Sequence, residues 1–554
     1  MINLNVTILK KALENEDIVQ KLGEQLVKKL KSKMNFAGER GKVEFDLTMM
    51  NIDHLKYLQE LTKADEDRGS TNFIGSIIKI KENPKKSKIS NLKALKSALQ
   101  EYLKMDFIRG WVFKKSKDGI FMPWLIVSCE YSEATKHSSA SVSITMVANK
   151  GDDKKGSSDC NRESIRIFSQ DIHGHTIESL FTSISWLKES ESLIQEYDKD
   201  KARFIEIKAL INHQLVSNKS GIGIKENGSS YEDKSSRFEE GRKFINDESQ
   251  LERVVYENWT STFLNELTIL RGLMIGEDDD SYIEMDYEIP HHTKLYLFDL
   301  NDHKHIWVHI SNIDIYEWKS DLKSKLVLPE IHHDLIEILA GDMGNVMEDV
   351  VDGKSGGTTI LCKGEPGLGK TLTAEIYSEV IEKPLYKVHS GQLGISPTQI
   401  EEKLKYVLSN AERWGAICLI DEADIFLKQR GDDLTQNAIV AVFLRTLEYF
   451  SGMLFLTTNR SNDIDDAILS RCIATIKYTR PDAESAKRIW KVLIEQYKAD
   501  VDDKMIEELV KIFHEISGRD IKELLKLTIK YANGKNKKID VNDFRICGVF
   551  RGLA

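Results

Sequence analysis

The chain has 554 residues, too many for a single hydrophobic core, so about two to four domains are expected. Its 41% hydrophobic and 30% charged residues are typical of a soluble globular protein, and no apolar run approaches the length of a membrane span. The formal net charge of −10 argues against a nucleic-acid backbone as the main partner.

The six cysteines show neither a C-x-x-C pair nor the spacing of metal ligands. We therefore expect reduced, buried thiols in a cytoplasmic protein. The first residues become charged and amphipathic by Lys10, which is not typical of a secretory signal.

The first region, 1–215, mixes helical and strand patterns. Apolar residues recur at helical spacing through 1–35 and again through 176–213. Between these helical stretches several short runs have strand character, and two of them flank a turn at Asp118 and Gly119, which indicates a hairpin. The sequence therefore predicts an α+β domain of unknown role over 1–215.

A polar stretch follows over 216–245, rich in Ser, Gly, Lys and Glu, and it is interpreted as a linker or mobile loop. A connector or second N-terminal subdomain is predicted over 246–323. It begins with a helical pattern at 251–273 and an acidic turn at 277–280, and strand-like runs follow. The acidic turn lacks the residue order of a calcium loop, so a solvated loop is the preferred interpretation.

From about residue 324 onward, short apolar runs alternate with helical segments. The runs are 358–363, 385–389, 416–420, 453–458 and 473–478. Such alternation predicts a parallel sheet covered by helices on both faces. Pro481 then marks a break, and the residues beyond it have helical spacing. We expect an α/β domain over 324–480 and a small helical domain over 481–554.

The most specific motif is the segment 364–371, which reads G-E-P-G-L-G-K-T and fits G-x-x-x-x-G-K-[ST] without a mismatch. Glycines allow successive N–H groups to point at phosphate oxygens, and the following helix adds its partial positive charge. Lys370 is expected to reach the β- and γ-phosphates, and the Thr371 hydroxyl to ligate Mg²⁺. The predicted nucleotide-binding residues here are Gly364, Glu365, Pro366, Gly367, Leu368, Gly369, Lys370, Thr371 and Leu372.

A second motif is an apolar strand that ends in Asp421 and Glu422. A carboxylate at a strand tip can hold Mg²⁺ through its water shell, and this role is assigned to Asp421. Glu422 can polarise the attacking water. The letters Asp-Glu-Ala-Asp also suggest an RNA helicase, but the chain lacks a second α/β lobe with arginine-rich motifs, so that class is not expected.

Three polar residues follow in the positions that a nucleotide site requires. Asn459 ends the next apolar strand and can hydrogen-bond the γ-phosphate or the water. Arg471 lies just beyond it and can be presented to a neighbouring subunit, where a guanidinium would stabilise charge on the transferred phosphoryl group. Arg519 opens a helix of the C-terminal domain and can reach the nucleotide, although a surface salt bridge is the alternative for a lone arginine.

These elements, in this order and spacing, resemble those of AAA+ ATPases. They correspond to the Walker A and Walker B motifs (364–371 and 418–422), sensor 1 (Asn459), the arginine finger (Arg471) and sensor 2 (Arg519). The resemblance implies a P-loop NTPase parallel sheet with a C-terminal helical lid. It also implies a homo-oligomeric ring, usually a hexamer, that binds ATP and Mg²⁺ at subunit interfaces.

The chain looks most like a poorly characterised branch of AAA-domain proteins known largely from fungi. The similarity covers about 295–530 and includes the run Glu412-Arg413-Trp414-Gly415-Ala416. One departure concerns the segment 390–397, where many AAA unfoldases carry an aromatic pore loop. Here it reads S-G-Q-L-G-I-S-P, so only Leu393 or Ile395 can replace the aromatic grip, and weakly. The sequence therefore argues against simple threading and leaves remodelling by domain motion open.

The leading hypothesis is a cytoplasmic AAA+ ATPase in which 1–290 recruit a protein target and 324–554 hydrolyse ATP in a ring. The second hypothesis is a nucleotide-controlled switch or scaffold in a regulatory or host-defence complex, without threading. A clamp-loader-like nucleic-acid motor is disfavoured by the acidic charge balance. No membrane partner is expected.

Overall fold

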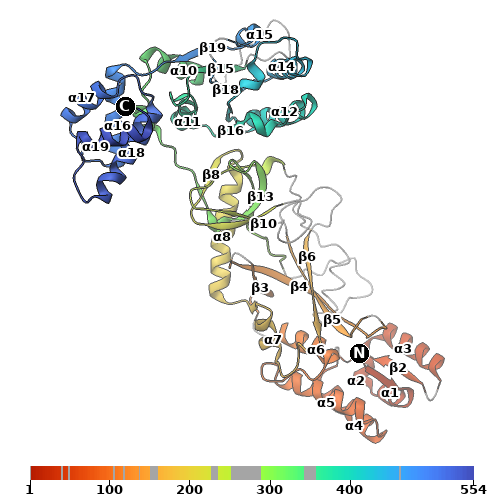
Figure 1. Cartoon of the computed structure of the whole chain (residues 1–554). Coiled ribbons are helices and arrows are strands. Elements are labelled where there is room, and N and C mark those ends of the chain that lie inside the picture. Colours follow the sequence, from red (N-terminus) through yellow and green to blue (C-terminus); the bar gives the residue numbers. More distant parts are fainter. Residues whose placement is uncertain are drawn as a thin grey trace. The chain divides into compact units, whose positions relative to one another are not determined.

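The computed structural model divides the chain into two compact units (Figure 1). Unit 1 comprises Met1–Glu206 and Gln250–Lys294, and unit 2 comprises Ile207–Ser249 and Leu295–Ala554. The residues described are 2–38, 41–45, 47, 50–103, 107–116, 119–136, 138–149, 160–225, 235–250, 288–341, 357–460 and 463–553. The predicted helix at 251–273 and the acidic turn at 277–280 lie outside these residues.

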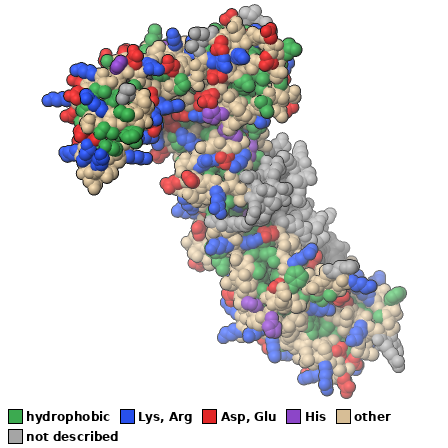
Figure 2. Space-filling model, viewed as in Figure 1, with side chains coloured by type: hydrophobic (Ala, Val, Ile, Leu, Met, Phe, Trp, Pro, Cys, Tyr) green, Lys and Arg blue, Asp and Glu red, His purple; other side chains and the backbone are tan. Residues whose placement is uncertain are grey.

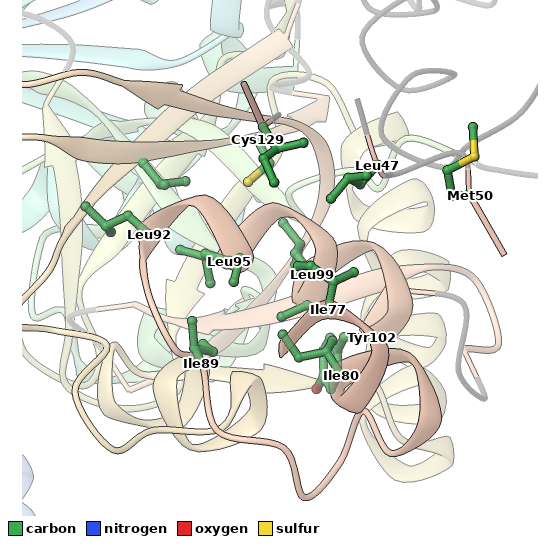
Figure 3. Packing of buried hydrophobic residues seen from close by; sticks show 14 of the residues in the cluster. Leu47, Met50, Ile77, Ile80, Ile89, Leu92, Leu95, Leu99, Tyr102 and Cys129 are labelled. Carbon is green, nitrogen blue, oxygen red and sulfur yellow. The ribbon is translucent and has the colours of Figure 1, made fainter. Parts of the chain in front are cut away.

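Unit 1 begins with a helical part that surrounds one apolar core. A two-stranded antiparallel sheet pairs β1 (Ile2–Asn5) with β2 (Lys42–Phe45). The helices are α1 (Val6–Ala12), α2 (Glu16–Leu22), α3 (Glu24–Ala37), α4 (Ile52–Ala64), α5 (Arg68–Glu82) and α6 (Leu92–Leu103). Figure 3 shows Leu95 and Leu99 of α6 among the buried side chains of this core, near Ile77. Helix α6 is central, since nine of its twelve residues are buried, the polar Ser97 and Gln100 among them.

The rest of unit 1 is a five-stranded antiparallel sheet in the order β6-β5-β4-β3-β7. Its strands are β3 (Trp111–Lys115), β4 (Phe121–Ser132), β5 (Ser141–Asn149), β6 (Cys160–Phe168) and β7 (Trp186–Lys188), with helices α7 (Ile177–Ser183) and α8 (Glu191–Ala209). Strand β4 is buried on both faces from Met122 to Cys129. One face packs in the core that contains α6, and the other packs beside α8. The expected α+β character and the β3–β4 hairpin are therefore both present.

Unit 2 begins with a seven-stranded antiparallel sheet in the order β10-β9-β13-β12-β11-β8-β14. The strands are β8 (Gln214–Ser217), β9 (Gly221–Lys225), β10 (Ser235–Phe238), β11 (Lys243–Asn246), β12 (Lys294–Asp299), β13 (Lys304–His309) and β14 (Ile313–Ile315). The prediction of a linker over 216–245 is therefore wrong for the described residues of that stretch. Two of its glycines, Gly221 and Gly223, lie in β9, and a Cβ on Gly223 would lie 2.7 Å from Ile306 Cδ1 on the neighbouring strand.

The second part of unit 2 is a five-stranded parallel sheet in the order β16-β17-β18-β15-β19. The strands are β15 (Thr358–Gly364), β16 (Leu385–His389), β17 (Ile417–Asp421), β18 (Met453–Thr458) and β19 (Ala474–Tyr478). They coincide with the five predicted runs to within a residue at each end, because strands buried on both faces are continuously apolar. The predicted α/β fold is confirmed.

Helices cover both faces of the parallel sheet. Successive residues of β17 enter opposite cores: Cys418 and Ile420 pack with α12 (Pro397–Trp414) and α14 (Leu434–Leu447). Ile417 and Leu419 pack with α10 (Glu330–Gly341) and α11 (Lys370–Val380). This alternation follows from the two-residue period of a strand.

The C-terminal helical lid has a core of its own, which includes Trp490, Leu509, Leu524 and Phe544. Its helices are α16 (Ala483–Tyr497), α17 (Asp503–Ile512), α18 (Gly518–Gly534) and α19 (Val541–Arg551). Each begins after an Asp or Ser whose side chain accepts a backbone N–H, which stabilises the helix start. Many charged side chains lie on the face of the lid that Figure 2 shows, with hydrophobic side chains among them. In the described part of the chain, every helix is too short or too polar to cross a lipid bilayer.

Candidate nucleotide-binding site

The glycine loop connects the end of β15 to the start of α11, as the motif predicts. Gly364, Gly367 and Gly369 have φ values of 153°, 82° and 98°. A side chain at any of these positions would strain the backbone, whereas glycine adopts the left-handed region readily. Gly369 is the N-cap of α11, so the positive end of this helix faces the loop. The local sequence therefore builds an anion-binding turn.

Lys370 lies at the centre of the site. Its Nζ donates to the carbonyl oxygens of Gly364 (2.8 Å) and Glu365 (2.7 Å) and to Asn459 Oδ1 (2.9 Å). The side chain is largely buried, and burial lowers its pKa from the ordinary value. The fold thus brings the predicted loop lysine and the predicted sensor asparagine into contact.

Asp421 at the tip of β17 lies beside Thr371. The hydroxyls of Thr371 (2.9 Å) and Thr457 (2.5 Å) both donate to Asp421 Oδ1. Burial raises the pKa of this carboxyl, but the two hydroxyl hydrogen bonds and the nearby positive charge of Lys387 together outweigh that effect, and the pKa lies below its ordinary value. An ionised carboxylate next to a hydroxyl oxygen fits Mg²⁺, which keeps several waters and takes few protein ligands.

Glu422 follows Asp421 in an unusual backbone conformation. Its φ is 55°, a value that non-glycine residues rarely adopt, and its side chain is exposed toward the cavity described below. Its backbone N–H donates to Thr457 Oγ1 (3.0 Å). Sequence reasoning gave Thr457 no role, although two hydroxyls directly before the asparagine are a visible signal. Strain held by neighbouring contacts is common at functional sites.

The lid closes one side of the site. The backbone N–H of Arg519 donates to the Gly367 carbonyl oxygen (3.1 Å). A Cβ on Gly367 would lie 2.8 Å from Arg519 Cβ and 2.9 Å from Ser517 Oγ, so glycine is required by this close approach. The predicted lid arginine is therefore next to the glycine loop.

These residues line a cavity of about 960 Å³. Its walls include the glycine loop from Pro366 to Leu372, together with Asp421, Glu422, Asn459, Arg519, the connector residues Leu326 to Pro329 and one face of α16. The volume lies at the upper end of the range for small-molecule sites. The carboxyl ends of parallel strands converge here, which is where open α/β sheets bind ligands.

Three predicted site residues do not line this cavity: Gly364 and Glu365, which begin the glycine loop, and Arg471. Arg471 lies just after α15 (Asp466–Leu469) and is exposed. Its guanidinium contacts the Ala467 carbonyl oxygen (3.2 Å) and Glu448 (3.8 Å) instead. It does not line its own subunit's cavity.

The segment 390–397 contains a short 3₁₀ turn, Ser390–Leu393. Leu393 is only 1% exposed and belongs to the core beside α12, whereas Ile395 is 82% exposed. The expectation that Leu393 can replace a pore aromatic is therefore wrong, because its side chain is occupied in packing. Ile395 is the available candidate.

The seven-stranded sheet contacts the ATPase domain through a buried carboxylate that sequence reasoning did not single out. Asp247, fully buried, accepts two hydrogen bonds from Arg413 Nη2 (2.7 and 2.9 Å), one from Trp414 Nε1 (2.8 Å) and one from His305 Nε2 (2.7 Å). Arg413 and Trp414 end α12. The run E-R-W-G-A noted above thus supplies a docking contact within unit 2.

A second contact involves the far end of α11, the helix that begins with Lys370. Glu379 accepts from Lys243 Nζ (2.7 Å), Tyr316 Oη (2.7 Å) and the backbone N–H of Lys319 (3.2 Å). Burial raises the pKa of Glu379, but its hydrogen bonds have the larger, opposite effect. The pKa therefore lies below its ordinary value. One helix therefore joins the glycine loop to the seven-stranded sheet.

Fold and site together define a nucleotide-binding protein of the P-loop class. Residues 360–480 match the family described as "ATPase family associated with various cellular activities (AAA)". These residues therefore form an AAA+ ATPase domain.

Similar proteins include a proteasome regulatory subunit homolog of Methanothermobacter thermautotrophicus, 30% identical over 186 residues, which are 31% of this chain and 49% of that protein. Fidgetin-like protein 1 of Drosophila melanogaster is 27% identical over 177 residues, 30% of this chain and 34% of that protein. The chain thus spans half or less of these relatives. A solved structure, the FIGL-1 AAA domain in complex with ADP, is 18% identical with a TM-score of 0.34, covering 41% of this chain and 82% of that one.

Proposed function

We propose that this protein is an ATP-hydrolysing AAA+ machine that remodels a protein target or complex as a ring of identical subunits, with a hexamer favoured. Residues 1–290 recruit the target. The observation that carries the proposal is the contact of Lys370 with Asn459 beside the Thr371–Asp421 pair, all at one edge of the parallel sheet.

In this proposal the glycine loop binds the phosphates of ATP through backbone N–H groups, and Lys370 and Arg519 add positive charge. Thr371 and Asp421 hold Mg²⁺, which when bound neutralises charge on the phosphate oxygens. Glu422 polarises a water molecule for attack on the terminal phosphorus. Asn459 orients that water or the terminal phosphate by a hydrogen bond.

A ring is supported by the position of Arg471, which does not line its own subunit's cavity. Two exposed apolar side chains lie near it: Ile473 (60% exposed) is two residues further along the chain, and Tyr449 (62%) directly follows Glu448, which the Arg471 guanidinium contacts. Burial of such side chains against a second subunit would favour association. In that arrangement Arg471 stabilises charge on the phosphoryl group bound by its neighbour.

The hydrolytic assignment is tested with Glu422→Gln. We expect turnover, measured as phosphate release, to fall by about 10²–10⁴-fold, because loss of a general base has that effect. ATP affinity, measured by titration calorimetry, should change little. Glu484→Gln, an exposed lid carboxylate, is the matched control. Wild-type turnover in the Glu422 variant would overturn the assignment.

The action of Arg471 between subunits is tested by mixing two inactive variants. Arg471→Ala keeps an intact nucleotide site, and Lys370→Ala keeps an intact arginine. In a mixed ring, a Lys370→Ala subunit supplies its arginine to an Arg471→Ala neighbour, so part of the activity should return. Light scattering with ATP should show the accompanying rise in mass. No recovery in rings shown to be mixed contradicts the arrangement.

A nucleotide-controlled switch or scaffold is the second candidate, and the burial of Leu393 favours it over threading. The two differ in their response to an unfolded protein. A remodeller should show a higher ATPase rate when an unfolded substrate is added. A switch should show no change in rate but should capture a partner in only one nucleotide state.

The cytoplasmic location that we propose is consistent with the cysteines. Five of the cysteines are free thiols, and four of these are buried: Cys129, Cys362, Cys418 and Cys547. Burial raises the pKa of Cys362 and Cys418 to about 12, so these thiols are unreactive at neutral pH.

A further inference from the structure

The last acid of the Asp-Glu-Ala-Asp run, Asp424, has no role in the mechanism above. It is half-buried and begins α13 (Asp424–Leu427). Its Oδ1 accepts a hydrogen bond from the Thr458 hydroxyl and another from the backbone N–H of Asn459 (3.2 Å). The carboxylate therefore contacts Thr458, the last residue of β18, and Asn459, the sensor asparagine that follows it.

This contact bears directly on the geometry of Asn459. Asn459 leaves the sheet after β18, so strand pairing no longer restrains it. The Asp424 carboxylate restrains its backbone instead, and its side-chain Oδ1 accepts from Lys370 Nζ (2.9 Å). Without Asp424, the asparagine is held on one side only.

The same contact restrains the turn that carries Glu422. Thr457 and Thr458 point to opposite sides of β18, since successive strand residues alternate. Thr457 binds the start of the turn through Asp421 (2.5 Å) and the Glu422 N–H (3.0 Å), and Thr458 binds its end through Asp424. Glu422, with a φ of 55°, lies between these two attachments. Such a conformation persists only where its neighbours determine it.

We propose that Asp424 is a positioning residue for hydrolysis: it fixes Asn459 against Lys370 and holds the Glu422 turn from its second side. It acts as a hydrogen-bond acceptor, and it acts through Asn459 and Glu422 rather than on ATP. The proposal rests on the proposed function, since it concerns the same reaction.

The test compares Asp424→Ala with Asp424→Asn. Alanine removes the acceptor, so kcat should fall by about 10–100-fold, the effect of misplacing reacting groups by about 1 Å. The ATP dissociation constant should stay within about threefold, because neither variant touches the glycine loop. Asparagine keeps an oxygen at Oδ1 and should recover most of kcat. Thr458→Val should reproduce the alanine effect, and Thr458→Ser, which keeps the hydroxyl, should not.

A double-mutant cycle separates positioning from loss of structure. In an Asn459→Ala background, Asp424→Ala should cost less in kcat than it does in the wild type, because one of the two groups that it positions is gone. Asp463→Asn, a carboxylate of the same loop whose side chain pairs with Arg460, is the control and should keep wild-type kcat.

Three results would overturn the inference: full kcat in Asp424→Ala, no recovery in Asp424→Asn, or an undiminished cost in the Asn459→Ala background. Failure of the proposed function is seen separately. In that case the wild type and Glu422→Gln would show the same rate of phosphate release, whatever the Asp424 variants do.

Discussion

Replacing Asp247 by alanine should destabilise unit 2 strongly. This carboxylate is fully buried and accepts hydrogen bonds from Arg413, Trp414 and His305. Alanine removes the carboxylate that pairs with the Arg413 guanidinium, whose side chain is 26% exposed. It also leaves the buried Trp414 indole N–H without an acceptor. Both changes affect the attachment of the seven-stranded sheet to α12.

The magnitude follows from these contacts. Removing one partner of a buried ion pair costs about 3–5 kcal/mol, and the partial exposure of Arg413 places this case near the lower end. An unsatisfied buried N–H costs about 1–3 kcal/mol more, but water that enters the site can hydrogen-bond this group and offset part of the cost. We expect a loss of about 3–4 kcal/mol in the free energy of unfolding. For unit 2, with about 300 residues, that is a fall of roughly 5–6 °C in Tm.

The assay is scanning calorimetry of the full chain, with and without ATP. The transition that ATP raises belongs to unit 2, since a ligand stabilises the unit that binds it. Asp302→Ala is the control, because this carboxylate of the same sheet also pairs with an arginine, Arg242, but is 38% exposed. Exposed pairs contribute about 0–1 kcal/mol, so Tm should fall by less than about 2 °C. Equal shifts in the two variants would refute the reasoning.

Three further predictions concern the site and its surroundings. Gly367→Ala should weaken ATP binding by about tenfold or more, since its Cβ would meet the lid helix at 2.8 Å; titration with a fluorescent ATP analogue checks this, and unchanged affinity contradicts it. In denaturant unfolding, Leu393→Ala should lower the free energy of unfolding by about 2–4 kcal/mol, and Ile395→Ala, at an exposed position, by less than about 0.5 kcal/mol. Equal losses would contradict the different burial of the two side chains. Burial raises the pKa of Glu379, but hydrogen bonds, first that from Lys243, hold the pKa below its ordinary value of 4.5. The ionised Glu379 therefore stabilises the fold fully above pH 4.5, and this stabilisation is lost as pH falls through the lower pKa of the folded state. Glu379→Gln should accordingly flatten the acid limb of a plot of stability against pH. An unchanged slope would argue against this contact.

Much of the ATPase domain could be predicted from the sequence because its signals are local. The strands of the parallel sheet are short continuous apolar runs, and glycine at 364, 367 and 369 indicates a turn that other residues cannot form. Asp421 and Glu422 follow such a run directly. In each case neighbouring residues carry the whole signal.

The seven-stranded sheet could not be predicted in the same way. Between 216 and 245 the strands are short and contain glycine and serine, so their composition is that of a loop. They form a sheet because β8 pairs with β11 and β9 pairs with β10 and β13. The burial of Asp247 could not be predicted either, because a position between Asn246 and Glu248 is typical of a solvated acid. Its carboxylate is buried because Arg413 and Trp414, which are distant in sequence, hydrogen-bond to it.

The sequence by itself determined the chemistry of this protein: a phosphate loop with its lysine, two acids at a strand tip, an asparagine and two arginines. The tertiary structure decided which of these act together. Lys370 meets Asn459, and Thr371 meets Asp421, because parallel strands bring their carboxyl ends to one edge of the sheet. It also decided that Leu393 packs inside while Ile395 faces outward, since burial depends on what the neighbouring helix covers.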